Sequence, residues 1–230
     1  SRGAVLAIYM IALYGGQALG QFLLDLGRAT PSLPFALASI LISLSILPIA
    51  LTRSASPTIG ATPALPIRRL YAISPLGFVG AAVTGLALGS FYGMGAVYAR
   101  RLGMDIAATA GFMSAVITGG VLLQWPLGWL SDKLDRRSVI IGALIGATLI
   151  SILIAAAPRG AGLWLLAAAG IFGGLTFALY PLSVAHANDH VLPEERVGAS
   201  GGLVLVYSAG AAIGPALSAA VISVLGAVGL

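Results

Sequence analysis

Long apolar runs alternate with short polar breaks along the whole chain. Seven runs are long enough to cross a membrane: residues 3–26, 32–52, 72–99, 107–130, 138–157, 161–187 and 197–225. A hydrocarbon core of about 30 Å needs roughly 20 residues of helix. Backbone groups in lipid must be hydrogen-bonded within their own segment, so these runs predict helices. The pattern therefore predicts an all-α, polytopic membrane helix bundle.

Composition removes the main competing classes. The chain is 59% hydrophobic and 8% charged, and its mean hydropathy is +1.03, which excludes a soluble domain of this length. There is no cysteine, so disulfides and thiolate metal sites are excluded, and we expect no metal and no cofactor. The net charge of +5 comes from basic residues in the polar breaks, which does not indicate a nucleic-acid partner. The expected partners are the lipid bilayer and a small-molecule substrate.

The breaks also predict organisation and orientation. Residues 53–70 are rich in Pro, Ser and Thr with basic ends, as is typical of a linker outside the membrane. They divide the chain into residues 1–52 and 71–230. If the linker is cytoplasmic, the breaks on that side hold eight of the twelve basic residues, in agreement with the positive-inside rule.

A charged break, Gly128-Trp-Leu-Ser-Asp132-Lys133-Leu-Asp-Arg136-Arg137, joins the fourth and fifth spans. Its pattern resembles the signature loop of the major facilitator superfamily of transporters. Asp135 stands where that signature usually has glycine, so we expect a turn built differently. The segments 123–128 and 179–190 are similar to the bacterial YcaD-like branch of that family.

An internal repeat agrees with this resemblance. Arg2-Gly3 with Gly16 and Gly20 matches Arg196-Val197 with Gly210 and Gly214 at a constant offset of 194 residues. Parallel repeats of this kind fit the family. The resemblance implies that the chain holds about helices five to eleven, with the linker between the two halves. It begins at Ser1 without a signal peptide, so we expect a fragment whose missing N-terminal helices belong to the same protein.

The resemblance also implies a function. A major facilitator is a secondary active transporter of the bacterial inner membrane that moves a solute by alternating access, and it is not an enzyme. Its seventh and tenth helices line the central cavity, and these would be the third and sixth spans here. Few charges and several aromatic rings favour a small, moderately apolar organic solute. The side chains expected to line the cavity are Tyr92, Met94 and Tyr98 opposite Thr176, Phe177 and Tyr180.

The first span adds a polar face to this cavity. Tyr14, Gln17, Gln21 and Asp25 fall on one arc at about 100° per residue, and the alternatives are a water-filled pathway or a bond to a neighbouring helix. Recurrent glycines lie elsewhere: Gly85/Gly89/Gly93, Gly142/Gly146, Gly170/Gly174, Gly198/Gly202 and Gly210/Gly214. This spacing favours close helix packing.

Ionisable residues predict contacts at the cytoplasmic ends. His186 is a candidate proton site, although a histidine there also caps a helix end. Arg136 or Arg137 is expected to approach Asp189, Glu194 or Glu195, and Glu194, Glu195 and Arg196 are expected to take part in a latch that holds the cytoplasmic ends together. We also expect Asp132 to form a latch with the helix start at Arg2 and Gly3, against the alternative of an exposed aspartate that caps its own loop.

Two other classes have weaker support. An intramembrane protease could use Ser114 with His186, or the pair Glu194 and Glu195. The predicted orientation puts Ser114 and His186 on opposite sides, too far apart for general-base catalysis. A channel or a non-transporting membrane protein is the second alternative, but no ring of selectivity groups is evident.

Overall fold

A computed structural model describes residues 12–28, 30, 32–51, 65–156 and 162–225. Residues 12–20 are α-helical and continue into a 3₁₀-helix, η1 (Gln21–Arg28), and together they are called the first helix. The other elements are α2 (Leu33–Leu51), α3 (Ile67–Ile73), α4 (Pro75–Arg101), α5 (Ile106–Lys133), α6 (Arg136–Ala155), α7 (Gly162–Asn188), η2 (Pro193–Glu195) and α8 (Arg196–Leu225). No strand occurs in these ranges, and the predicted all-α class is confirmed.

Five helices of the described chain, α4 to α8, are long and apolar enough to cross a membrane. They correspond to the last five predicted spans. α2 is also apolar, but its described apolar segment, Leu33–Pro48, is shorter. The first predicted span is described only from residue 12.

The helix ends at two places differ from the predicted ones by two or three residues. The third span was expected to begin at residue 72, but the chain forms the separate helix α3 and starts again at Pro75. Pro75 has no N–H to donate, and the Ser74 hydroxyl accepts from the Gly77 N–H at 3.3 Å, so a new helix starts there. The charged break is also mostly helical, because α5 continues through Lys133 and α6 begins at Arg136. Only Leu134 and Asp135 form the turn.

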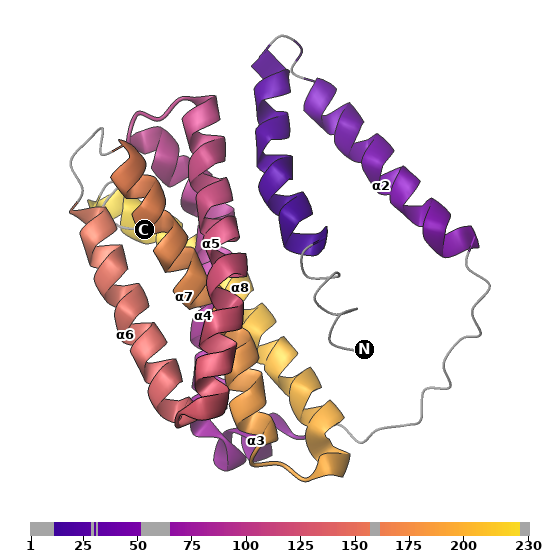
Figure 1. The fold of residues 1–230 in the computed structure, drawn as a ribbon, viewed down its shortest axis with the longest axis vertical. Helices are drawn as coiled ribbons and strands as arrows, with labels where there is room; N and C mark the ends of the chain where they lie inside the picture. The colour runs from indigo at the N-terminus through magenta and orange to yellow at the C-terminus, as the bar shows by residue number, and fades with distance from the viewer. Residues whose placement is uncertain (1–11, 29, 31, 52–64, 157–161, 226–230) are drawn as a thin grey trace.

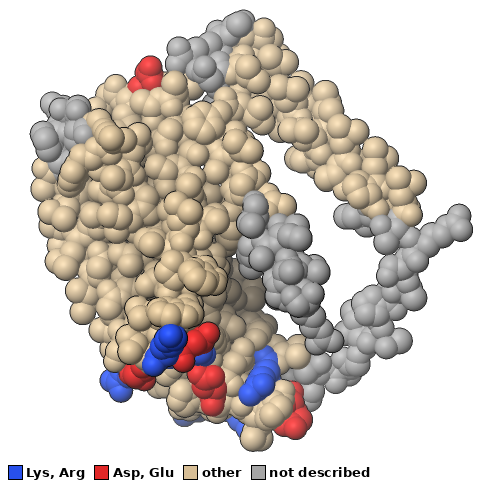
Figure 2. All heavy atoms as spheres, in the orientation of Figure 1, with Lys and Arg blue, Asp and Glu red and all other residues tan. Residues whose placement is uncertain are grey.

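Helices α4 to α8 lie side by side in one bundle (Figure 1). Helix α7 packs against α4, α5 and α6, while α8 packs along α4. The η1 part of the first helix packs against α5, and α2 packs on η1. Charged side chains gather at the end of the bundle that holds α3 and the α5–α6 turn (Figure 2). We call this the charged end.

Glycines let these helices touch backbone to backbone. A Cβ added at Gly89 would collide with the backbone of Ala211, and one at Gly119 with the backbone of Gly170. Lipid tails give apolar helices little hydrophobic reason to associate, so close packing of this kind is what holds them together. The expected packing role is confirmed for most of the predicted glycines, listed here with their contacts: Gly85, Gly89, Gly93, Gly146, Gly174, Gly202, Gly210 and Gly214. At Gly16, Gly20 and Gly142 an added Cβ would meet nothing within 4 Å.

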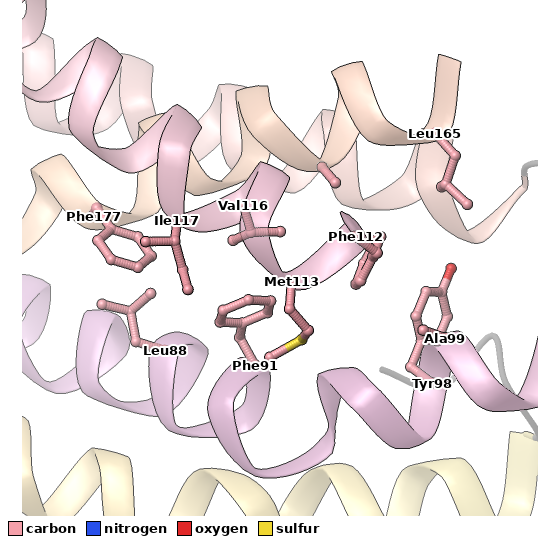
Figure 3. Packing of buried hydrophobic residues seen from close by; sticks show 11 residues of the cluster. Leu88, Phe91, Tyr98, Ala99, Phe112, Met113, Val116, Ile117, Leu165 and Phe177 are labelled. Carbon is pink, nitrogen blue, oxygen red and sulfur yellow. The ribbon is translucent and has the colours of Figure 1, made fainter. Parts of the chain in front are cut away.

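The main core lies between α4, α5 and α7 (Figure 3). It is built from apolar and aromatic side chains: Leu88, Phe91, Tyr98, Ala99, Phe112, Met113, Val116, Ile117, Leu165, Ala169 and Phe177. Tyr14 of the first helix packs against it. Every buried polar side chain in the described residues is a serine or threonine, so the bundle buries no charged side chain there.

Candidate functional site

Five aromatic rings from four helices converge where the first helix meets the bundle. They are Tyr14 of the first helix, Tyr92 of α4, Phe177 and Tyr180 of α7, and Tyr207 of α8, and we call them the aromatic cluster. The Phe177 ring lies 5.6 Å from Tyr14 and 6.2 Å from Tyr92, both edge-on. The Tyr180 and Tyr207 rings lie 4.9 Å apart. Such separations are those of favourable aromatic pairs.

A hydrogen bond at this cluster connects two residues that lie on either side of the linker in sequence. The Tyr92 hydroxyl donates to Gln17 Oε1 at 3.0 Å, and the Tyr92 side chain is 45% exposed. The two residues are on opposite sides of residues 53–70 in sequence. The first helix and α4 are thus joined by a polar contact inside an otherwise apolar region.

The other residues expected to line the cavity are placed differently. Thr176 is buried, and its hydroxyl donates to the Phe172 carbonyl of its own helix at 2.8 Å. Phe177 is also buried. Neither borders open space in this structure. Met94 is partly buried.

Tyr98 was expected beside Tyr92, but it lies in a separate region. It is 4% exposed, and its hydroxyl donates to the Ile154 carbonyl at 3.5 Å. It borders an apolar cavity of about 360 Å³ between α4, α5, α6, α7 and α8. Tyr98 and Tyr92 are six residues apart on α4, so about 600° of rotation turns them to different faces.

The predicted polar face of the first helix is only partly formed. Gln21 donates through Nε2 to the Gln17 carbonyl at 3.3 Å, which satisfies it within its own helix. Residues 21–28 form a 3₁₀-helix, and its tighter winding moves later residues off the 100° arc. The side chain of Asp25 is outside the described part.

Arg136 is the centre of an ion-pair network at the charged end. Its guanidinium binds Asp132 of α5 at 3.1 Å and Asp189 after α7 at 3.0 Å. The expected pairing of Arg136 with Asp189 is confirmed. Glu195 instead binds Arg69 of α3 at 2.7 Å, whereas Glu194 is exposed in η2 and Arg196 begins α8. Arg2 and Gly3 are outside the described residues, and so is the predicted latch with Asp132.

Asp135 stands where the family signature usually has glycine, and its side chain caps the start of α6. Its carboxylate accepts from the Ser138 hydroxyl at 2.8 Å and from the Ser138 N–H at 3.1 Å. These two hydrogen bonds, the hydroxyl first, hold the pKa of Asp135 below its ordinary value. The Asp135 φ of −59° is accessible to any residue, so the turn does not need glycine.

Two other residues of the charged break make local contacts at the end of α5. The Gly128 carbonyl accepts from the Ser131 hydroxyl at 2.8 Å, and Lys133 Nζ lies 4.1 Å from the centre of the Trp129 ring.

His186 borders a cleft of about 860 Å³ at the charged end, with Ser74, Asp135, Arg136 and Arg137. Its ring lies 4.6 Å from that of His190. The cap on the end of α7 comes from His190, whose Nδ1 lies 2.7 Å from the His186 carbonyl and donates to it. The spacing His186-x-x-x-His190 is the sequence signal that could have identified this pair.

Sequence reasoning also missed Tyr207. It lies three residues before Gly210, and residues three apart share a helix face. Gly210 packs on the backbone of Ala82 in α4. The three-residue spacing therefore places Tyr207 on the face of α8 that is turned toward α4.

The protease arrangement is not assembled. Gly120 of α5 packs against Phe177 of α7, and the two helices run in the same direction, since the C-terminal ends of both lie at the charged end. Ser114 precedes Gly120 by six residues and so lies toward one end of the bundle. His186 follows Phe177 by nine residues and lies toward the opposite end. At about 1.5 Å per residue they are separated by roughly 22 Å, too far for a proton transfer between them.

These features define an integral membrane bundle with an aromatic, hydrogen-bonded site on the boundary between its two sequence segments. The family model of the Major Facilitator Superfamily matches residues 77–229. The chain belongs to the major facilitator superfamily, and it is an integral protein of the bacterial inner membrane.

Among the curated proteins similar to this chain are bacterial proteins described as uncharacterized MFS-type transporter YcaD. Those of Salmonella dublin and Salmonella enteritidis PT4 are each 33% identical over 224 residues, and that of Salmonella arizonae is 32% identical over 227 residues. Each match covers 95% of this chain and 56% of the relative, so the chain spans about half the length of these relatives. No solved structure matches the chain.

Proposed function

We propose that the complete protein is a secondary active transporter that moves a small organic solute by alternating access. In this proposal residues 1–52 end one half and residues 71–230 form most of the other. The two halves rock about the aromatic cluster, and the charged end faces the cytoplasm. Family membership supports transport, while the structure supports the position of the site.

The observation that carries this proposal is the Tyr92–Gln17 hydrogen bond. It lies where the first helix meets α4, and the surrounding rings present faces and hydroxyls rather than charges. A solute bound there would contact both segments. Binding energy would then depend on how the segments are arranged, which is the condition for a solute to shift a conformational equilibrium.

The Arg136 network is proposed to act in gating. It joins α5, α6 and α7 at the charged end through Asp132 and Asp189. Exposed pairs of this kind contribute about 0–1 kcal/mol to stability. That is small for folding, but it is enough to bias two states of similar free energy. His186, beside this network, remains a proposed proton site.

Cysteine accessibility separates a transporter from a channel. These 230 residues contain no cysteine, so Tyr92→Cys introduces a single thiol into this part of the complete protein. A membrane-impermeant maleimide applied from either side should label it, and a transported solute should change the two rates in opposite directions. A channel would show parallel changes on both sides. Saturable uptake with counterflow in proteoliposomes then tests transport itself, and its absence for every solute that changes labelling rejects the proposal.

A further inference from the structure

The aromatic cluster contains no charged side chain within the described residues. Its members are four tyrosines and one phenylalanine, and the Tyr92 hydroxyl donates to the side-chain amide of Gln17. The cluster therefore presents ring faces, hydroxyls and one amide to any ligand.

Such a surface discriminates by charge. The face of an aromatic ring is negative, so a cation within about 6 Å of its centre is attracted and an anion is repelled. A compact ammonium ion would lose its hydration without gaining a counter-ion, which is costly in an apolar region. A cation whose charge is spread over a large apolar body avoids most of that cost. The chemistry favours lipophilic organic cations over neutral or anionic molecules of the same shape.

The backbone of Tyr207 is positioned by close helix packing. A Cβ added at Gly85 would collide with the Tyr207 carbonyl, so α8 lies directly on α4 at this residue. The Tyr207 ring is tilted by 57° against the Tyr180 ring, and the two ring centres are 4.9 Å apart. Both side chains are only partly buried, which leaves ring surface for a ligand.

We infer that the aromatic cluster binds a lipophilic organic cation and that Tyr207 determines this specificity. The inference rests on the proposed function and names the substrate class of the same site. It depends on ring faces, so replacing Tyr207 by phenylalanine should preserve most of the binding. Replacing it by leucine should not.

Equilibrium dialysis on the purified complete protein tests this, with tetraphenylphosphonium as the probe and tetraphenylborate as the anion of matching shape. Tetraphenylphosphonium should bind saturably and at least about tenfold more tightly than tetraphenylborate, since a cation over desolvated rings gains about this factor. Tyr207→Leu should weaken cation binding several-fold, whereas Tyr207→Phe should stay within about threefold of the parent. Tyr71→Leu, on α3 and outside the cluster, is the control. Elution as a single species in size-exclusion chromatography verifies folding, and Tyr180→Leu with Tyr180→Phe repeats the comparison if Tyr207→Leu fails that check.

The outcomes separate the inference from the proposed function. Equal binding of both ions, or undiminished cation binding in the leucine variants, overturns the inference. So does an absence of cation binding in a protein that shows counterflow of a neutral solute, which leaves transport intact. Selective cation binding that is lost in Tyr207→Leu supports the inference, and if no counterflow accompanies it, the transport proposal alone is rejected.

Discussion

At the scale of single residues, Asp135 shows how a departure from a family pattern is accommodated. The turn between α5 and α6 has only two residues, and Asp135 provides the hydrogen-bond acceptor that a glycine lacks. The carboxylate binds both donors of Ser138. Rigidity of this turn matters because the next residue, Arg136, links α6 to α5 and α7.

Replacing Asp135 by alanine should lower the thermal stability of the protein near neutral pH. The pKa of Asp135 is lowered in the folded state, so its contribution is fully present above the ordinary carboxyl pKa and is lost as pH falls through the lowered value. The difference between the parent and Asp135→Ala should therefore vanish in acid. Melting curves in detergent as a function of pH measure this.

Asp135→Asn is the matched control, because it keeps a side-chain acceptor at the cap without the titration. Its stability relative to Asp135→Ala should not vary with pH in this range. A parent–alanine difference that persists unchanged below the lowered pKa would contradict the role given to the carboxylate.

Contacts between single residues were predicted correctly where opposite charge alone determines the pairing. Arg136 and Asp189 have opposite signs and share one end of the bundle, so their pairing followed from topology. The positions of Tyr98 and Thr176 depended on helix rotation and on whether a hydroxyl bonds to its own helix. Sequence does not determine either one, since Thr176 is equally polar facing a cavity or its own backbone.

At the scale of helices, the bundle is organised by two close pairs, α4 with α8 and α5 with α7. Four-residue glycine spacing correctly predicted close packing, and the structure shows that the glycines of α4 and α8 pack on each other's helix. Gly119 and Gly173 have no such repeat in their own helices, yet both pack on opposing backbone. Gly142 has the spacing but faces open space in this structure. Spacing reports a glycine-lined face but not whether a helix covers it.

Gly89→Ala should destabilise the bundle by about 1–3 kcal/mol, the usual cost of overpacking. The added methyl would collide with the Ala211 backbone, which cannot rotate away as a side chain would. Gly142→Ala is the matched control, and it should be neutral or stabilising by up to about 1 kcal/mol because alanine favours the helix. Denaturation of the purified variants in mixed micelles gives both values. Equal stability of the two variants would show that α4 and α8 separate at no cost.

At the scale of the whole molecule, hydropathy predicted the number and order of the later helices because membrane thickness sets their length. It did not reveal which helices touch. That depends on small residues and on Tyr92–Gln17, a contact between residues 75 positions apart. The first helix meets the bundle through this bond and the Tyr14–Phe177 pair.

If the two segments rock during transport, this contact must open and close in every cycle. Replacing Gln17 and Tyr92 by cysteine in the complete protein, with any cysteine outside this chain removed, allows a short cleavable bifunctional maleimide to join them. Joining should block counterflow, and cleaving the linker should restore it. Gln17→Cys with Tyr71→Cys is the control pair, since Tyr71 lies on α3 at the charged end, and its two thiols should not be joined to each other. Tyr92→Phe removes only the hydrogen bond, worth about 0.5–1.5 kcal/mol, and should shift labelling of the site by a factor of about two to ten. Full-rate counterflow in the joined protein would show that the contact stays closed throughout transport, and the moving boundary would then lie elsewhere.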